Sequence, residues 1–278
     1  MAATIILKYC NYSLIINISK GDGIIQKLIV LDGGNNIGGS SYYLEWNNCR
    51  ILLDCGVAHN NAEIINFKSV LGNDFDRLNA IIISHAHRDH YGALFKNVTL
   101  NSHRIIATPK TKQLIKNRIS SHNFDEQYIS ESIYAYDYFK ILYCGQAECM
   151  LLPAGHIAGA AMVLIYVDNK KILYTGDFSM PFSICNQTHL MTLDFIRQLD
   201  ILIIESTNTL KKDKLITSSK HASLKDSYEL IKFCYPKQVF LVHQNSKSLG
   251  INLLKMQIEQ EYSTIKVFET ENNKTYYL

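Results

Sequence analysis

Residues 85–90 read His-Ala-His-Arg-Asp-His, and this short stretch decides how the rest of the chain is interpreted. The preceding residues, 80–84, are apolar and predict a buried strand, whereas 91–95 predict the start of a helix. Three histidines and one aspartate therefore fall in one tight turn between a strand and a helix. Only 10 of the 278 residues are histidine, so three within six positions argue against a polar loop with a chance excess of histidine.

The spacing inside this stretch suits two metal ions. Alternate residues of an extended segment point the same way, so His85 and His87 can share one ion. Asp89 and His90 follow after the chain has begun to turn and can face a second ion. Imidazole and carboxylate groups are natural ligands of zinc and similar transition metals.

Composition predicts a single compact domain that spans residues 1–278. The chain is 47% hydrophobic, which is enough for a substantial core, and it has four prolines and no Gly/Ser linker. The formal net charge of +3 gives no sign of a strongly basic nucleic-acid face, although it does not exclude a local one.

The cysteines and the apolar runs predict a cytoplasmic protein. The seven cysteines are odd in number and scattered, which is typical of reduced thiols in a cytosolic protein. Residues 1–16 are apolar but interrupted by Lys8 and Asn11, and they lack the basic start and small-residue cleavage site of a signal peptide. No run approaches the roughly 20 apolar residues that span a bilayer.

The predicted elements are mostly strands at first, and strands then alternate with helices. Short apolar runs predict strands at 4–7, 14–18, 28–31, 41–46, 50–54, 103–107, 147–153, 161–167, 171–174, 201–204, 238–242 and 264–268. Apolar periodicity and capping residues predict helices at 108–119, 191–199, 222–234 and 249–262. This order occurs twice, which predicts an α/β fold of two packed sheets with helices outside.

Two further segments are open to more than one interpretation. Residues 33–39 form a glycine-rich loop, but no Lys-Ser/Thr pair follows, so a plain turn or a loop lining a cleft is favoured over a phosphate cradle. Residues 120–139 are polar and rich in tyrosine, and they predict either helices that cover one rim of a site or an ordinary half-buried helical segment.

Polar groups at the ends of other predicted strands extend the candidate site. His156, Asp177 and His243 each follow a strand, where open α/β architectures place their sites. A lone histidine at a strand end is usually a satisfied polar group, and Asp54 alone could cap a turn. Together with the four groups at 85–90, however, the first three supply seven ligands, which suit two metal ions about 3.5–4 Å apart.

These residues resemble the five successive motifs of the metallo-β-lactamase superfamily, in the right order: Asp54, residues 85–90, His156, Asp177 and His243. The resemblance implies a four-layer αββα sandwich. The flanking residues resemble the nucleic-acid-processing β-CASP branch of that superfamily, which includes RNase J, at 153–162, 171–179, 200–207, 219–223 and 239–243.

By this resemblance, the seven ligands divide between two zinc ions. His85, His87 and His156 would hold the first ion, Asp89, His90 and His243 would hold the second, and Asp177 would bridge them. A hydroxide held by the two ions would attack phosphorus in line.

The resemblance also implies a general acid. His221 would protonate the leaving oxygen, Glu205 would orient His221, and Asp54 would support the ligand loops. Asp89 belongs to this catalytic set as well as to the metal ligands. Glu205 could instead cap a turn, and His221 could be a surface residue ahead of the helix predicted at 222–234.

The chain departs from the β-CASP pattern between the acidic motif and the histidine motif. That branch carries a long inserted domain there, the β-CASP cassette, whereas only 13 residues, 208–220, separate the two motifs here. Four lysines in this segment form either a small basic rim or a solvated loop: Lys211, Lys212, Lys214 and Lys220. We expect the set of catalytic and metal-binding residues to be complete. The part of the protein that would cover the substrate is expected to be absent, or to come from a protein partner or a second copy of the chain.

Three functions are compatible with these features. The leading prediction is a cassette-less zinc phosphodiesterase that acts on RNA or single-stranded nucleic acid, since a poor alkoxide leaving group benefits from an acid such as His221. A metallohydrolase of a small lactone, thioester or cyclic nucleotide is favoured by the shortened cover. A non-catalytic assembly subunit is disfavoured, because such subunits commonly lose metal ligands and all seven are present.

Overall fold

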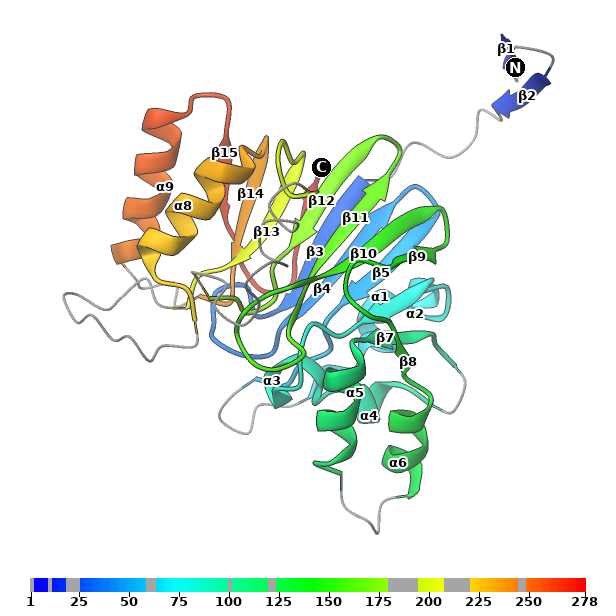
Figure 1. Ribbon diagram of the computed structural model, residues 1–278, viewed down its shortest axis with the longest axis vertical. Helices are drawn as coiled ribbons and strands as arrows, with labels where there is room; N and C mark the ends of the chain where they lie inside the picture. Colours follow the sequence, from blue (N-terminus) through cyan, green and yellow to red (C-terminus); the bar gives the residue numbers. More distant parts are fainter. Residues whose placement is uncertain are drawn as a thin grey trace.

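Two seven-stranded mixed sheets packed face to face form the centre of the protein (Figure 1). The computed structural model describes residues 3–9, 12–18, 26–58, 64–99, 102–119, 124–179, 195–207, 221–244 and 249–278. Among these residues, no helix is both long and apolar enough to cross a bilayer.

The first sheet has the strand order β16-β3-β4-β5-β6-β7-β8. Pairing is antiparallel from β16 to β5 and parallel from β5 to β8. The strands are β3 (Gln26–Asp32), β4 (Ser41–Trp46), β5 (Cys49–Leu53), β6 (Ala80–Ile82), β7 (Ile105–Ala107), β8 (Tyr134–Ala135) and β16 (Lys274–Tyr277).

The second sheet has the strand order β15-β14-β13-β12-β11-β10-β9. Pairing is antiparallel from β9 to β12 and parallel from β12 to β15. The strands are β9 (Ile141–Cys144), β10 (Ala147–Pro153), β11 (Ala161–Val167), β12 (Lys170–Tyr174), β13 (Ile201–Glu205), β14 (Gln238–Val242) and β15 (Lys266–Glu269). A separate antiparallel hairpin joins β1 (Ala3–Tyr9) to β2 (Tyr12–Ile18).

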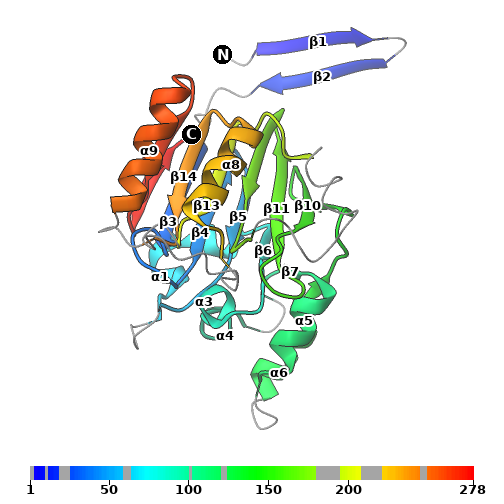
Figure 2. The same ribbon diagram turned by 60° about the vertical axis from the view of Figure 1, so that its left-hand side comes forward.

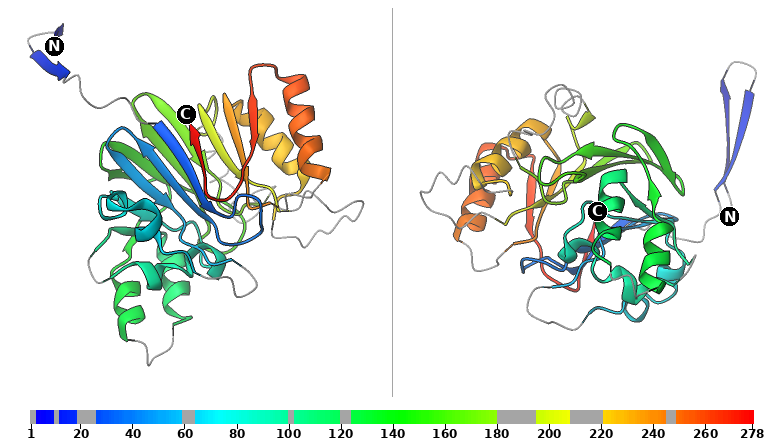
Figure 3. Two further views of the ribbon diagram at one scale, coloured as in Figure 1. Left: turned by 180° about the vertical axis from the view of Figure 1, so that it is seen from behind. Right: turned by 60° about the horizontal axis from the view of Figure 1, so that its bottom comes forward.

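Helices cover the outer faces of both sheets (Figures 2 and 3). On the first sheet lie α1 (Phe67–Leu71), α2 (Asn73–Asp76), α3 (Arg88–Tyr91), α4 (Leu94–Asn97), α5 (Pro109–Lys116) and α6 (Phe124–Glu131). On the second sheet lie α8 (Leu224–Cys234) and α9 (Leu249–Glu261). This arrangement confirms the predicted four-layer αββα sandwich.

Alternation along the strands explains why the sheets are buried on both faces. In β13, Ile201 and Ile203 belong to the apolar layer between the sheets, whereas Leu202 and Ile204 belong to the layer under α8 and α9. Successive side chains of a strand point to opposite faces, so a continuous apolar run can serve two layers at once.

The parallel strands bring the candidate site together. The chain leaves β5, β6, β12, β13 and β14 at their carboxyl ends, which lie at one edge of the sandwich because these strands run parallel within each sheet. The next residues along the chain are Asp54, residues 83–90, residues 175–177, Ser206 and His243. One edge of the fold therefore collects polar groups from both sheets.

The structure confirms most of the predicted elements. The helix predicted at 108–119 is α5, and Thr108 caps it as expected, because its Oγ1 accepts a hydrogen bond from the Thr111 amide over 3.1 Å. The helix predicted at 222–234 is α8, which begins with a capping box formed by Ser223 and Asp226. Of the helix predicted at 191–199, residues 191–194 lie outside the described residues, and residues 196–199 form bends and coil instead of a helix.

Other elements differ from the prediction. The segment 120–139 contains a helix, α6, but it then turns into the edge strand β8. Strand β16 also went unpredicted, since it is short and polar and pairs with β3 from the opposite end of the chain. Strands this short are defined by the neighbour they pair with more than by their own sequence.

Replacing Ile203 with alanine should test the layer between the sheets. Ile203 is fully buried there, so Ile203→Ala should lower the free energy of unfolding by about 2–5 kcal/mol in urea titration. Leu253→Ala is the matched control, because Leu253 is 51% exposed on α9 and its loss should cost about 0.5 kcal/mol or less. Equal losses for both variants would contradict the assigned layer.

Candidate metal centre

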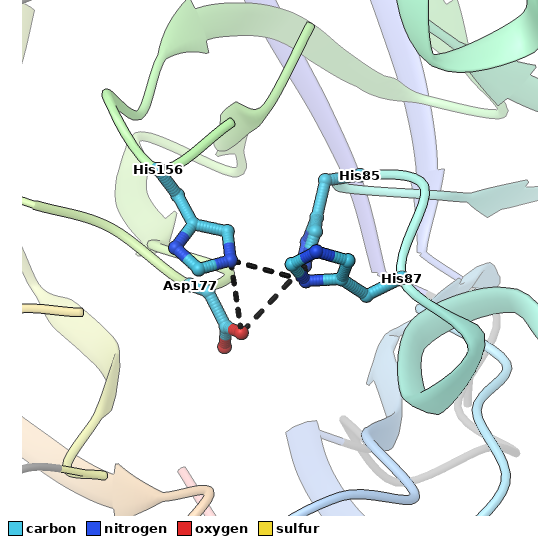
Figure 4. A group of neighbouring side chains, drawn as sticks. All are labelled: His85, His87, His156 and Asp177. Carbon is cyan, nitrogen blue, oxygen red and sulfur yellow. Dashed lines mark hydrogen bonds and ion pairs between the residues drawn. The ribbon is translucent and has the colours of Figure 1, made fainter. Parts of the chain in front are cut away.

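Seven histidine and aspartate side chains converge at the common edge of the two sheets. The first group contains His85, His87, His156 and Asp177, whose nearest ligand atoms all lie within 4.8 Å of one another (Figure 4). The Nδ1 atom of His87 lies 2.9 Å from Nε2 of His85 and 3.1 Å from Nε2 of His156. Three imidazole nitrogens therefore face one point.

The second group contains Asp89, His90 and His243, again with ligand atoms within 4.8 Å of one another. Oδ2 of Asp89 lies 3.4 Å from Nε2 of His243 and 3.9 Å from Nε2 of His90. The amide of Gly38 also donates a hydrogen bond to Nε2 of His243 over 3.0 Å, so the glycine-rich loop at 33–39 lines the site.

Asp177 lies between the two groups and turns one carboxylate oxygen toward each. Oδ2 is 3.6 Å from Nε2 of His85 and 3.7 Å from Nε2 of His156. Oδ1 is 3.3 Å from Nε2 of His90 and 3.8 Å from Nδ1 of His243. This is the arrangement that a carboxylate bridging two cations requires.

The buried polar atoms of this centre are consistent with divalent metal binding. Nε2 of His90 and Oδ1 of Asp177 are buried and have no hydrogen-bond partner among the described residues. Buried polar atoms are nearly always satisfied, so two such atoms that lie 3.3 Å apart without a hydrogen bond indicate a missing ligand. The residues present therefore fit a metal ion.

Protonation of the histidines gives the same indication. Burial lowers the pKa of His85 well below its usual value and the pKa of His87 to about 4, which keeps both rings neutral, as metal ligands must be. His90 differs. Burial lowers its pKa, but the charges of Asp177 and Asp54 outweigh burial and raise it. The two carboxylates thus favour positive charge beside His90, from a proton or from a metal ion.

Asp54 holds the ligands from behind. Its carboxylate is fully buried and accepts hydrogen bonds from the Ser84 amide (2.6 Å), the Ser84 hydroxyl (2.7 Å), Nδ1 of His90 (2.7 Å) and the Tyr174 hydroxyl (2.6 Å). The Ser84 hydroxyl in turn lies 3.0 Å from Nδ1 of His85. Both rings are thereby held with Nε2 toward the centre, which is how partners of metal-binding histidines usually act.

Gly56 allows the loop of Asp89 to approach. A Cβ atom at Gly56 would lie 1.8 Å from the carbonyl oxygen of Asp89, and that same oxygen accepts a hydrogen bond from the Ser40 amide over 2.9 Å. Any side chain at Gly56 would push the Asp89 backbone away, so only glycine fits.

Glu205 and His221 form a pair beside the bridging carboxylate. Nδ1 of His221 lies 3.1 Å and 3.2 Å from the two oxygens of the buried Glu205, and 3.6 Å from Oδ2 of Asp177. Burial lowers the pKa of His221, but the hydrogen bond to Glu205 and its negative charge outweigh burial and raise that pKa to about 9. A protonated imidazole here can donate a proton to a reacting oxygen.

Thr207 connects this pair to the second ligand group. Its hydroxyl donates a hydrogen bond to Oε2 of Glu205 over 2.5 Å and lies 2.7 Å from Nδ1 of His243. Since the hydroxyl proton points to Glu205, the same oxygen accepts from Nδ1 of His243, which leaves Nε2 of that ring to accept the hydrogen bond from the Gly38 amide, 3.4 Å from Oδ2 of Asp89.

The structure brings together every residue predicted for the site, including Asp54, Glu205 and His221. Sequence reasoning missed three hydroxyl groups that orient them, on Ser84, Tyr174 and Thr207. The sequence offered one signal for each of them, namely its closeness to a predicted site residue. Ser84 directly precedes His85, Tyr174 lies three residues before Asp177, and Thr207 lies two residues after Glu205. The predicted lysine rim at 211–220 lies outside the described residues.

Comparison with known proteins identifies the family. A profile described as the beta-lactamase superfamily domain matches residues 49–244, more than half of the chain. The chain belongs to the metallo-β-lactamase superfamily. Solved structures agree on the fold. The metallo-β-lactamase fold protein YhfI from Bacillus subtilis superposes with a TM-score of 0.64 over 90% of this chain and 99% of that one, at 16% identity.

Sequence relatives of this metallo-β-lactamase superfamily member include RNA-processing proteins. Cleavage and polyadenylation specificity factor subunit 3 of Dictyostelium discoideum is 29% identical over 229 residues, which is 72% of this chain and 29% of that protein. An RNase J-like protein of Methanocaldococcus jannaschii is 31% identical over 201 residues, which is 65% of this chain and 42% of that protein. The chain thus spans less than half the length of these curated relatives.

Removing the Thr207 hydroxyl should weaken metal binding. Thr207→Val leaves Oε2 of Glu205 and Nδ1 of His243 without their shared partner, so metal affinity measured by chelator competition should fall about 10- to 100-fold. Thr207→Ser keeps the hydroxyl and should bind metal like the unaltered protein. If valine and serine variants bound metal equally well, the orienting role of Thr207 would be wrong.

Proposed function

We propose that this protein is a dinuclear metal-dependent phosphodiesterase that cleaves RNA or another single-stranded nucleic acid, with zinc as the expected metal. The observation that carries the proposal is the third cluster of the site. Ligand atoms of Asp177, Glu205 and His221 lie within 4.8 Å of one another. The hydrogen-bonded pair of Glu205 and His221, which can donate a proton, therefore lies next to the carboxylate that faces both ligand groups.

The two ligand groups would hold one ion each, and Asp177 would contact both. His85, His87 and His156 would hold the first ion, and Asp89, His90 and His243 the second. Divalent ions at such ligands lower the pKa of water to supply a nucleophile near neutral pH, and they stabilise the charge that develops on phosphoryl oxygens.

The protein's own residues would handle the leaving group. Glu205 accepts from Nδ1 of His221, so Nε2 is the atom at which His221 would give a proton to the departing oxygen. Breaking a phosphodiester releases an alkoxide, a strong base that leaves readily only when it is protonated. Thr207 and the amide of Phe178 hold the Glu205 carboxylate in place, over 2.5 Å and 3.0 Å.

The sequence relatives support a nucleic-acid substrate. They carry the names of an RNase J-like protein, a cleavage and polyadenylation factor and, in Gibberella zeae, endoribonuclease YSH1. The short segment 208–220 favours a second candidate, a hydrolase of a small lactone, thioester or cyclic nucleotide, because a short cover encloses less substrate. If the substrate is a nucleic acid, a protein partner or a second copy of the chain would cover the substrate in place of a longer segment.

Metal content and a substrate panel should test this proposal together. Elemental analysis of the purified protein should give about two ions per chain, and one ion or none would contradict a dinuclear centre. The protein should cleave labelled single-stranded RNA, single-stranded DNA or a phosphodiester chromogen, and Asp177→Ala should abolish that cleavage because it removes the carboxylate shared by both groups. Turnover of a lactone alone would favour the second candidate.

Replacing His221 should separate proton donation from metal binding. His221→Ala should slow cleavage of an alkyl phosphodiester by about 10²–10⁴-fold, the usual contribution of a general acid, while the metal content stays at the level of the unaltered protein. A chromogen with a good leaving group should be cleaved with a smaller loss, since it needs no proton. Unchanged turnover of RNA would remove His221 from the mechanism.

A further inference from the structure

A broad cleft lies outside the metal centre, on the tyrosine-rich segment that follows α5. It has a volume of about 1070 Å³, and its walls come from α5, α6, the start of β7 and the edge strand β8. The residues that carry the argument are Arg104, Lys112, Tyr128 and Tyr134.

Two aromatic rings are exposed in this cleft. Tyr128 is 51% exposed and Tyr134 is 56% exposed, and Tyr143 on the neighbouring edge strand β9 is 60% exposed. Large rings that remain open to solvent in one region are typical of a surface that binds something. Flat rings of this kind can stack on nucleobases.

Arg104 is held rigidly among the tyrosines. Its guanidinium donates hydrogen bonds to the Tyr136 hydroxyl over 2.6 Å and to the Tyr143 carbonyl, and it lies 5.8 Å from the ring centre of Tyr134. These two bonds use two of its five N–H groups, so donors remain for an anionic group. Arginine in a rigid setting of this kind is well suited to phosphate.

In the described part of the chain, the two positive charges of the cleft form no direct ion pair, although Lys116 and, to a smaller extent, the charge of Lys112 lower the pKa of the nearby Glu131 carboxyl. Among the described residues, neither Arg104 nor Lys112 forms an ion pair, and Nζ of Lys112 donates instead to the carbonyls of Glu131 (2.6 Å) and Ile133 (2.8 Å). The Glu131 carboxylate also lines the cleft, but it is paired with Lys116. The wall therefore presents two cations beside two aromatic rings.

Helix α5 connects the cleft to the metal centre. At its start, the hydroxyls of Thr108 and Thr111 donate to the carbonyl of Gly159, in the loop that carries His156. Just after its end, Arg118 donates to the carbonyl of Ala86, between two ligand histidines. Lys112, in the middle of the same helix, lines the cleft.

We propose that this cleft binds single-stranded RNA, with bases stacked on Tyr128 and Tyr134 and phosphates near Arg104 and Lys112. The proposal rests on the proposed function, and it assigns to the cleft the substrate contact that a longer segment at 208–220 would otherwise provide. Charge favours RNA over a protein partner. A single RNA strand offers a phosphate and a stackable base at every nucleotide, which matches cations placed beside exposed aromatic rings.

Binding of a cleavage-resistant RNA should test the cleft without relying on turnover. Fluorescence anisotropy with a phosphorothioate-linked single-stranded RNA should show dissociation constants raised about 5- to 150-fold for Tyr128→Ala and for Tyr134→Ala, the loss expected from one missing stack. Tyr134→Phe keeps the ring and should bind normally. Tyr277→Ala is the matched control, because Tyr277 is 82% exposed on the distant edge strand β16.

A salt titration should test the phosphate contact. Lys112→Gln should reduce the slope of log affinity against log salt by about 0.7, as expected for one lost phosphate contact on a single strand. Melting temperatures should show that each variant is folded. Equal RNA affinity in all tyrosine variants would overturn the proposal and leave a protein as the partner for this cleft. Loss of hydrolysis across the substrate panel, with RNA binding still dependent on the tyrosines, would overturn only the proposed function.

Discussion

The site depends on the buried carboxylate of Asp54. A buried carboxylate is tolerated only when hydrogen bonds replace the water it has lost, and an ionised one can accept about four. Asp54 accepts four, from both groups of Ser84, from His90 and from Tyr174. Because Tyr174 belongs to β12 and Ser84 follows β6, this single group ties the ends of both sheets together behind the metal ligands.

Two separate chains of hydrogen bonds organise the site. One runs from Asp54 through Ser84 to His85, and the other runs from Glu205 through Thr207 to His243. Each chain begins at a buried carboxylate and ends at an imidazole, so each decides which ring nitrogen carries the proton. Asp177 then stands where the two ligand groups meet, with one oxygen for each.

Chemistry and substrate contact occupy different parts of this fold. Most of the ligands lie at or just after strand ends, where the hydrogen-bonded sheets fix the backbone that carries them. The aromatic and cationic cleft lies at the sheet edge on α5, α6 and β8.

The amino-acid sequence by itself predicted the candidate ligands and the order of layers. His85, His87, Asp89 and His90 are neighbours in the chain, so a joint role as ligands can be predicted without a fold, and the continuous apolar run of β13 is typical of a strand buried on both faces. The polar strand ends could be grouped because parallel strands place their carboxyl ends at one edge. Together with the family resemblance, this was sufficient to predict the sandwich and the seven histidine and aspartate side chains that the structure brings together.

Only the tertiary structure decided which partners these residues have. Ser84, Thr207 and Tyr174 are ordinary hydroxyl residues in the sequence. Their roles appear only when neighbouring strands of one sheet, or for Tyr174 the two sheets, bring them within 3 Å of a carboxylate or an imidazole. The pairing of β16 with β3 and the cleft around Arg104 likewise join segments far apart in the chain. Contacts of this kind depend on how the strands pair and how the sheets pack. Local sequence patterns do not specify either.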